Sequence, residues 1–121
     1  MKELRLHMSE KEGTRLPDIC GAAVDLINGP ISGSKHISIA IIYIDPGKQS
    51  IPHYHKNTEE IYYFLEGNGR TIIEGETIDV GPGSVVFLPL FKRHQVINDS
   101  QQPLKFLSSD APPYDPADVY F

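Results

Sequence analysis

The sequence predicts an all-β protein of the sandwich or barrel type. Its 121 residues are enough for one domain with a hydrophobic core of its own. Gly and Pro, ten residues of each, divide much of the chain into short segments rich in β-branched and aromatic residues. Over windows of about 11 residues, no segment shows the apolar period of an amphipathic helix. Short strands separated by Gly and Pro turns favour a sandwich or a barrel.

The clearest strand is at residues 36–44, which include five isoleucines and one tyrosine and end at the turn Asp45-Pro46-Gly47. The mixed apolar segment at residues 19–27 is either a strand or a short turn of helix. Further strands are expected at residues 60–66, 70–74, 77–80, 84–89, 94–98 and 104–108, which gives about eight in total. We expect residues 70–74 to pair back on residues 60–66 through a hairpin turn at Gly67-Asn68-Gly69.

The charge and the cysteine content exclude several classes of protein. Asp and Glu number 16 against 11 Lys and Arg, a net charge of −5 that argues against a nucleic-acid partner. The single Cys20 excludes an internal disulfide and a multi-cysteine zinc site, and we expect it to be a small buried hydrophobic residue. No apolar run reaches the ~18 residues of a membrane span, and the N-terminus lacks a signal-peptide core. We therefore expect a cytoplasmic protein with neither a nucleic-acid nor a membrane partner.

Histidines supply the clearest chemical signal. His53 and His55 are two positions apart, so on an extended strand both imidazoles point to the same face. Glu60 stands at the entry to a predicted strand, and His94 follows a turn. Three imidazoles and one carboxylate are a good ligand set for Mn, Fe, Co, Ni, Cu or Zn. A lone pair of histidines is a weak signal, because exposed or ordinarily hydrogen-bonded pairs are common. We expect His36 to be one such surface residue.

The spacing of these residues resembles the two motifs of the cupin superfamily, in particular of small single-domain cupins with the type-2 conserved barrel. The first motif, G-x5-H-x-H-x3/4-E-x6-G, is matched by Gly47, His53, His55, Glu60 and Gly67. The second motif, G-x5-P-x-G-x2-H-x3-N, is matched by Gly83, Pro89, His94 and Asn98. Phe91 departs from it, because it stands where the motif has a glycine.

The resemblance implies a double-stranded β-helix, or jelly-roll, barrel. It also implies that one divalent transition metal (Fe, Mn, Ni or Zn) is held by His53, His55, Glu60 and His94. The motif register selects Glu60 over Glu59, because only Glu60 is followed by a glycine at the motif distance. Glu59 is then expected to be a solvated charge.

Strand parity predicts the residues that line a pocket beside this site. Tyr62 and Phe64 share the face of Glu60, and Val96 shares the face of His94. Phe91 is expected near the mouth of the pocket. The pocket should therefore be mostly apolar. Lys56, Lys92 and Arg93 are the basic residues of the motif loops, and no Lys or Arg occupies an obviously inward strand position, which disfavours a phosphosugar or oxalate substrate.

The domain organisation is expected to have three parts. Residues 1–35 form a polar lead-in, residues 36–110 form the cupin barrel and residues 111–121 form a proline-rich tail. A jelly roll leaves sheet edges that must be covered, and small cupins often dimerise. We therefore expect a homodimer, in which residues 19–27 are a candidate for an exchanged strand. The tail either packs on the barrel through Tyr114, Tyr120 and Phe121 or frays.

The leading hypothesis is a metal-dependent enzyme that oxidises a small molecule with O₂, in the manner of a dioxygenase. The first alternative is a metal-assisted isomerase of a sugar or a keto acid. The second is a non-catalytic cupin that binds a metal or a small ligand. The sequence assigns no catalytic residue beyond the implied metal ligands.

Overall fold

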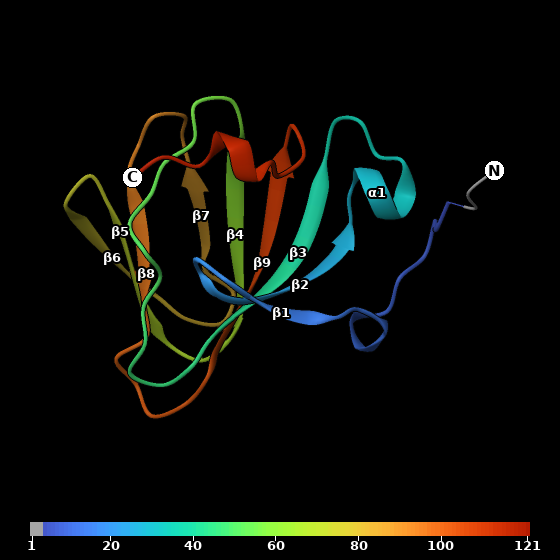
Figure 1. The fold of residues 1–121 in the computed structure, drawn as a ribbon. Helices are drawn as coiled ribbons and strands as arrows, with labels where there is room; N and C mark the ends of the chain where they lie inside the picture. Colours follow the sequence, from blue (N-terminus) through green and yellow to red (C-terminus); the bar gives the residue numbers. More distant parts are fainter. Residues whose placement is uncertain (1–3) are drawn as a thin grey trace.

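The computed structural model describes residues 4–121, which form two antiparallel sheets that face each other (Figure 1). The larger sheet has the strand order β1-β2-β3-β9-β4-β7, and the smaller sheet has the order β6-β5-β8. The strands are β1 (Arg15–Asp18), β2 (Gly21–Ile27), β3 (Ser38–Ile44), β4 (Glu59–Glu66), β5 (Gly69–Ile73), β6 (Glu76–Val80), β7 (Val85–Leu88), β8 (His94–Ile97) and β9 (Leu104–Ala111). The helical turns are η1 (Glu10–Glu12), α1 (Gly29–Ser32) and η2 (Pro116–Asp118). Within residues 4–121, no helix has the length and hydropathy needed to cross a membrane.

From β4 onward the chain alternates between the two sheets. β4, β7 and β9 belong to the larger sheet, whereas β5, β6 and β8 belong to the smaller one. This arrangement is a double-stranded β-helix, so the predicted jelly-roll fold is confirmed. The strand ends agree with the predicted ranges to within two residues, except that β9 continues to Ala111.

The predicted pairing of residues 70–74 with residues 60–66 is wrong. β4 pairs with β7 and β9, whereas β5 pairs with β6 and β8 in the other sheet. Gly67, at φ 83°, turns the chain at a corner where a Cβ atom would lie 2.3 Å from the carbonyl oxygen of Pro103.

The lead-in forms one end of the larger sheet. β1 and β2 form a hairpin, and β2 pairs with β3 of the same chain. β1 was not anticipated, because it is a four-residue edge strand that contains Pro17, a residue tolerated only where no ladder hydrogen bond is needed. The single turn of α1 is too short to show a helical period, although the Asn28 side chain caps it by accepting from the Ile31 amide at 2.8 Å. Exchange of residues 19–27 between two subunits stays a prediction.

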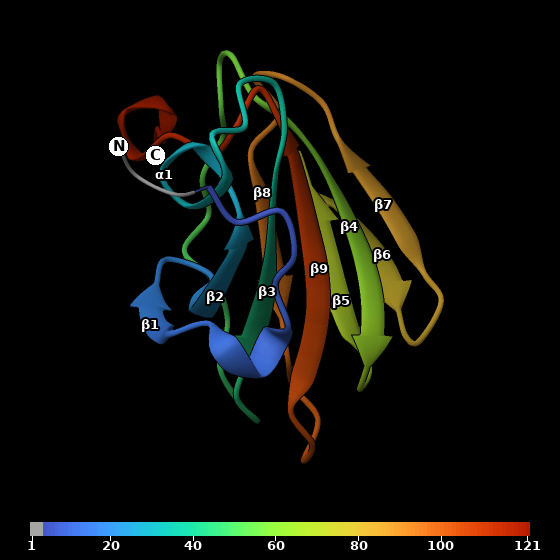
Figure 2. The ribbon, with the colours of Figure 1, turned by 90° about the vertical axis from the view of Figure 1, so that its right-hand side faces the viewer.

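The segment that holds η1 covers the outer face of the larger sheet beside β3 (Figure 2). Glu10 accepts a hydrogen bond from the Tyr43 hydroxyl. Arg15 lies over the Tyr43 ring, with its Cζ atom 4.4 Å from the ring centroid. Val24 and Ile41 are buried even though they lie outside the main core cluster. The lead-in therefore covers sheet surface that the core does not.

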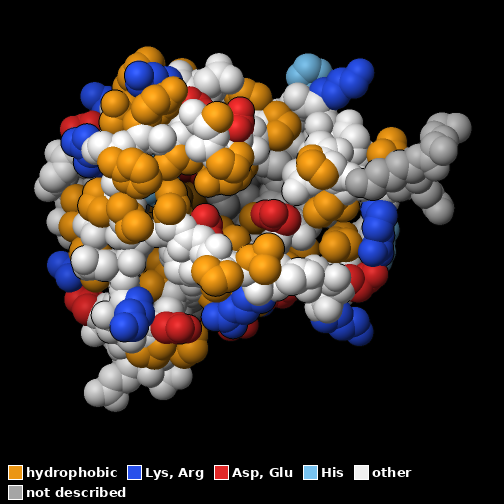
Figure 3. Space-filling view, viewed as in Figure 1, with side chains coloured by type: hydrophobic (Ala, Val, Ile, Leu, Met, Phe, Trp, Pro, Cys, Tyr) orange, Lys and Arg blue, Asp and Glu red, His pale blue; other side chains and the backbone are white. Residues whose placement is uncertain are grey.

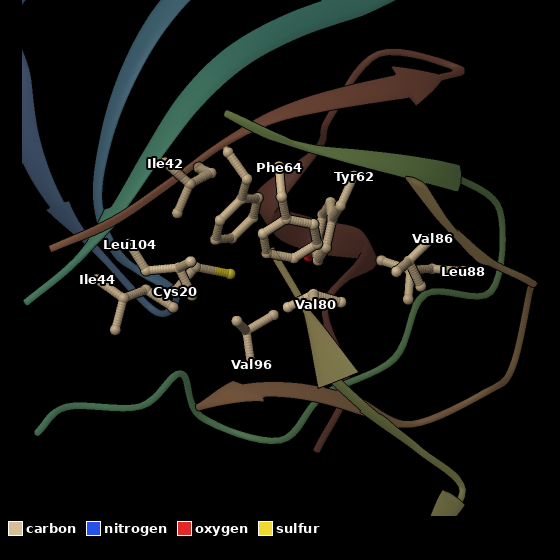
Figure 4. Packing of buried hydrophobic residues seen from close by; sticks show 11 residues of the cluster. Cys20, Ile42, Ile44, Tyr62, Phe64, Val80, Val86, Leu88, Val96 and Leu104 are labelled. Atoms are coloured by element: carbon tan, nitrogen blue, oxygen red, sulfur yellow. The ribbon is translucent and has the colours of Figure 1, made fainter. Parts of the chain in front are cut away.

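The core between the sheets follows the alternation along β4. Tyr62 and Phe64 point inward and are at most 1% exposed, whereas Ile61 and Tyr63 are 45% and 43% exposed. Phe106 on β9 packs against both inward rings, with centroid distances of 4.7 and 4.9 Å. The other buried members of the cluster come from the neighbouring strands and the β1–β2 turn (Figure 4): Cys20, Ile42, Ile44, Val80, Val86, Leu88, Val96 and Leu104.

Two phenylalanines of the larger sheet test this description of the core. Phe64 is fully buried and Phe87 on β7 is 51% exposed. Truncation of a buried Phe leaves a cavity, so Phe64→Ala should lower the free energy of unfolding by about 3–5 kcal/mol. Phe87→Ala, as the control, should lower it by less than about 1 kcal/mol. Urea unfolding followed by circular dichroism measures both, and similar losses would contradict the assignment of the core.

Candidate metal centre

The four residues predicted as metal ligands converge from three parts of the fold. His53 and His94 face each other in an antiparallel bridge: the His53 amide donates to the His94 carbonyl at 3.1 Å, and the His94 amide donates back at 2.8 Å. Their rings are 4.4 Å apart between centroids. His55 lies two residues beyond His53, and Glu60 projects inward from β4. Backbone pairing therefore brings together residues that are up to 41 positions apart in the sequence (94 − 53).

The side chains meet in a small, buried cluster. One ligand atom from each of the four residues lies within 4.8 Å of the others. Glu60 Oε1 is 2.9 Å from His55 Nε2 and 3.3 Å from His94 Nε2. All four side chains are buried, with exposed fractions of 1–4%. Burial of several ionisable groups in one place is costly unless a counter-charge joins them.

The Nδ1 atom of each ring is held by a backbone carbonyl. His53 Nδ1 donates to Ile51 at 2.7 Å, His55 Nδ1 donates to Asp118 at 2.9 Å and His94 Nδ1 donates to Lys92 at 3.1 Å. A carbonyl oxygen only accepts, so each Nδ1 carries the proton, and Nε2 of the neutral ring carries a lone pair.

The arrangement of donor atoms in the cluster favours a bound cation. The lone pairs of His55 and His94 Nε2 face the Glu60 carboxylate, and these three buried atoms have no hydrogen-bond partner within residues 4–121. The short contacts to Glu60 Oε1 are thus acceptor against acceptor unless a proton or a metal ion lies between them. A divalent transition metal would join all three imidazoles and the carboxylate, so the residues present fit such an ion.

Burial and neighbouring charges shift the pKa values of three of the four cluster residues. Burial, together with the nearby His94, lowers the pKa of His53 to about 4, which keeps this ring neutral. Burial acts to raise the pKa of Glu60, but its close contacts with His55 and His94 outweigh it and hold the pKa well below its usual range. Burial acts to lower the pKa of His55, and the adjacent Glu60 carboxylate outweighs it, so that the pKa is raised. Glu60 therefore favours the protonated form of His55, whereas burial favours the neutral form of His53.

The C-terminal tail packs on the barrel and supports His55. The Asp118 carboxylate accepts from three successive backbone amides, those of residues 56, 57 and 58, at 3.0–3.1 Å. Its carbonyl oxygen accepts from His55, as described above. Tyr120 forms a backbone bridge with Tyr54, and their rings stack 5.5 Å apart. Asp118 could not be predicted from the sequence, because its partners lie about 60 residues away.

A cavity of about 540 Å³ reaches the cluster from the side of His53 and Glu60. Its other walls are the β1–β2 hairpin, the start of α1, the inner faces of β3 and β9 and the tail at residues 113–116. Most of the lining is apolar, as the sequence predicts. Of the four residues expected to line a pocket, Tyr62 lies in the cavity wall.

The other three predicted lining residues lie elsewhere. Phe64 and Val96 belong to the closed core. Strand parity predicts which face of a strand points inward, but it does not predict where along that face the interior opens into a cavity. Phe91 is 58% exposed and adopts a left-handed conformation with φ 66°, while its amide donates to the His55 carbonyl at 2.8 Å. Its backbone therefore keeps the glycine-like turn of the motif, and its ring points to the surface.

Polar residues of β9 that sequence reasoning missed also line the cavity. Ser108 Oγ donates to Asp110 Oδ1 at 3.1 Å and lies 3.4 Å from Glu60 Oε2. Burial and the charge of Glu60 raise the pKa of Asp110 to about 9. The signal lay in the strand's alternation, where Leu104 and Phe106 give way to Ser108 and Asp110 on the same face.

The ligand assignment predicts which histidines matter for metal content. His53→Ala and His94→Ala should each abolish stoichiometric metal, because each removes one of four ligands. His36→Ala changes an exposed histidine outside the cluster and should leave metal content unchanged. Inductively coupled plasma mass spectrometry of the purified variants measures this. Full metal content in either cluster variant would contradict the assignment.

The tail predicts a second effect on metal affinity. Asp118→Ala removes the carboxylate that holds residues 56–58 and loosens the carbonyl that orients His55. Loss of an orienting partner typically weakens metal binding by about 10–100-fold. Competition with a chromogenic chelator measures the affinity, with Asp79→Ala, at an exposed position on β6, as the control. Equal affinities would show that the tail does not position His55.

Comparison with known proteins agrees with this fold and cluster. A family model described as a cupin domain matches residues 40–110. An uncharacterized protein of Methanocaldococcus jannaschii is 35% identical over 82 residues, which are 68% of this chain and 66% of that protein. Oxalate decarboxylase of Bacillus subtilis is 32% identical over 61% of this chain and 20% of its own length. Glucose-6-phosphate isomerase of Thermococcus kodakarensis is 35% identical over 46% of this chain and 33% of its own length.

The chain thus spans between a fifth and about two thirds of the curated relatives that it matches here. Among solved structures, a protein of Planctomyces limnophilus superposes with a TM-score of 0.83 at 22% identity, over 98% of this chain and 97% of that one. The fold is shared over nearly the whole length. The family model matches more than half of the residues of this chain, which shows that the chain belongs to the cupin family.

Proposed function

We propose that this cupin is a metal-dependent enzyme that oxidises a small organic molecule with O₂. The carrying observation is that the cavity ends on two of the four candidate ligands, His53 and Glu60. A molecule in the cavity therefore has direct access to an ion held by the cluster. When bound, a divalent transition metal supplies Lewis-acid or redox chemistry at this point.

The chain's own residues bind and shield the reacting molecule. The cavity is of a size usual for small-molecule sites, and its apolar walls exclude water from the inner end. Tyr62 is fully buried, and burial raises the pKa of its hydroxyl, so that it stays protonated beside the cluster. Ser108 and Asp110 provide the other polar groups of the inner wall.

One observation favours metal-assisted isomerisation as the second candidate. Burial and the charge of Glu60 raise the pKa of Asp110, which lies within hydrogen-bond reach of Glu60 at the inner end of the cavity. A protonated carboxyl beside a metal site is suited to proton transfer between neighbouring carbons of a keto or hydroxy compound. The resemblance to enzymes named glucose-6-phosphate isomerase adds support for this class.

The two candidates predict different behaviour of the purified protein. Oxidation requires iron or manganese content and O₂ uptake with a panel of small phenols and hydroxy ketones, measured by an oxygen electrode. Isomerisation requires metal but no O₂ uptake, and it exchanges substrate hydrogen with deuterated water, which NMR detects. His94→Ala serves as the control in both assays and should abolish turnover.

Two further outcomes would overturn the proposal of an enzyme. A stoichiometric metal without turnover of any compound would support a binding module, and absence of stoichiometric metal would remove the basis for metal chemistry altogether.

A further inference from the structure

The charge of the cavity lining is one-sided. Among the residues that line it, five carry carboxyl groups and none is a lysine or an arginine: Asp18, Asp25, Glu60, Asp110 and Asp115. The remaining lining residues are mostly apolar. On the face shown in Figure 3, Asp and Glu side chains gather near the central hollow, while most Lys and Arg side chains lie toward the rim.

Basic residues near the cavity are held on other surfaces. Arg15 belongs to β1, which supplies part of the cavity wall, but its guanidinium lies over the Tyr43 ring and 3.6 Å from Asp45. Lys105 on β9 pairs with Glu10 at 3.0 Å beneath the lead-in. Arg93, beside the metal cluster in sequence, lies over Tyr54. These contacts direct the nearest positive side chains away from the cavity interior.

Asp18 is placed to sense the charge of a bound molecule. It is the last residue of β1 and lies half-buried in the cavity wall, where its carboxylate accepts from the amides of Ile19 and Cys20. Burial raises its pKa, and the charges of Asp25 and Glu60 act in the same direction. An anion brought close to Asp18 adds repulsion to an already unfavourable carboxylate, whereas a cation relieves it.

The inner end of the cavity has the opposite preference when a metal is bound. Glu60, 4% exposed, offers there an oxygen with no hydrogen-bond partner among the described residues. A divalent ion would leave net positive charge at the cluster, which attracts an oxygen donor of the substrate. The cluster and Asp18 therefore favour different groups of a bound molecule.

We propose that the substrate is an apolar molecule with a metal-binding oxygen and, apart from it, a neutral or cationic group, and that Asp18 rejects a negative charge on that second group. This inference rests on the proposed function for the orientation of the substrate. It separates this chain from relatives whose names indicate doubly charged substrates, oxalate or a sugar phosphate.

A matched series of catechols tests the proposal. Dopamine, 4-(2-hydroxyethyl)catechol and 3,4-dihydroxyphenylacetate share a head that chelates divalent metals, and their short tails end in ammonium, hydroxyl and carboxylate groups. Binding to the zinc-loaded protein, which is redox-silent, is measured by isothermal titration calorimetry. Dopamine should bind at least about tenfold more tightly than the carboxylate, with the alcohol between them.

The variant Asp18→Asn keeps the shape and the oxygen that accepts the turn amides but removes the charge. It should reduce the ratio of dopamine to carboxylate affinity several-fold, and Asp25→Asn on β2 should act in the same direction. Asp79→Asn makes the same change at an exposed position on β6 and should leave the ratio unchanged. Circular dichroism verifies that each variant is folded.

The outcomes separate this inference from the proposed function. A carboxylate that binds as tightly as dopamine, or a ratio that Asp18→Asn leaves unchanged, would overturn the selection by charge even if the protein holds metal and turns over a substrate. If no metal binds, the proposed function fails. The affinities of the three catechols for the metal-free protein then still show how the carboxylates of the cavity discriminate among the three tail charges.

Discussion

The donation of three histidine Nδ1 protons to backbone carbonyls is the constraint on which the site depends. These bonds fix the rings of His53, His55 and His94 so that their Nε2 lone pairs are free. The Glu60 carboxylate faces two of these lone pairs, so the fold brings together acceptors that repel one another without a cation. The free energy for holding them in place comes from the paired backbone of the two sheets and from the core beneath the site.

Much of the fold could be predicted from the sequence because its signals are local. Turn residues and β-branched runs located most strands, and the order of glycines and histidines fixed the register of the four candidate ligands. The crossing of the chain from the larger sheet at β4 to the smaller sheet at β5 could not be predicted in this way. A hairpin and a corner both leave the same alternation along the strand, and the close approach of Gly67 to the Pro103 backbone joins residues 36 positions apart (103 − 67).

The parts of the site that escaped prediction are those built by long-range contacts. The tail carbonyl that orients His55 and the carboxylates that line the cavity lie in segments with no motif of their own. Phe91 shows the converse case, in which a departure from the motif suggested a new group at the pocket. The structure instead absorbs the substitution as a left-handed residue with its ring outside. Motif spacing thus located the four residues that cluster as candidate ligands, whereas only one of the four residues expected to line a pocket lies in the cavity wall.

The position of Asp118 has a consequence for how the protein matures. His55 acquires its final orientation only when β9 has paired between β3 and β4 and the tail has docked over residues 56–58. These are pairings between distant parts of the chain, which form slowly because they close large loops. A metal that binds the complete cluster and not the unfolded chain stabilises the last-formed arrangement by mass action. Metal uptake would then report on the completion of folding, and the loaded protein would unfold more slowly than the metal-free chain.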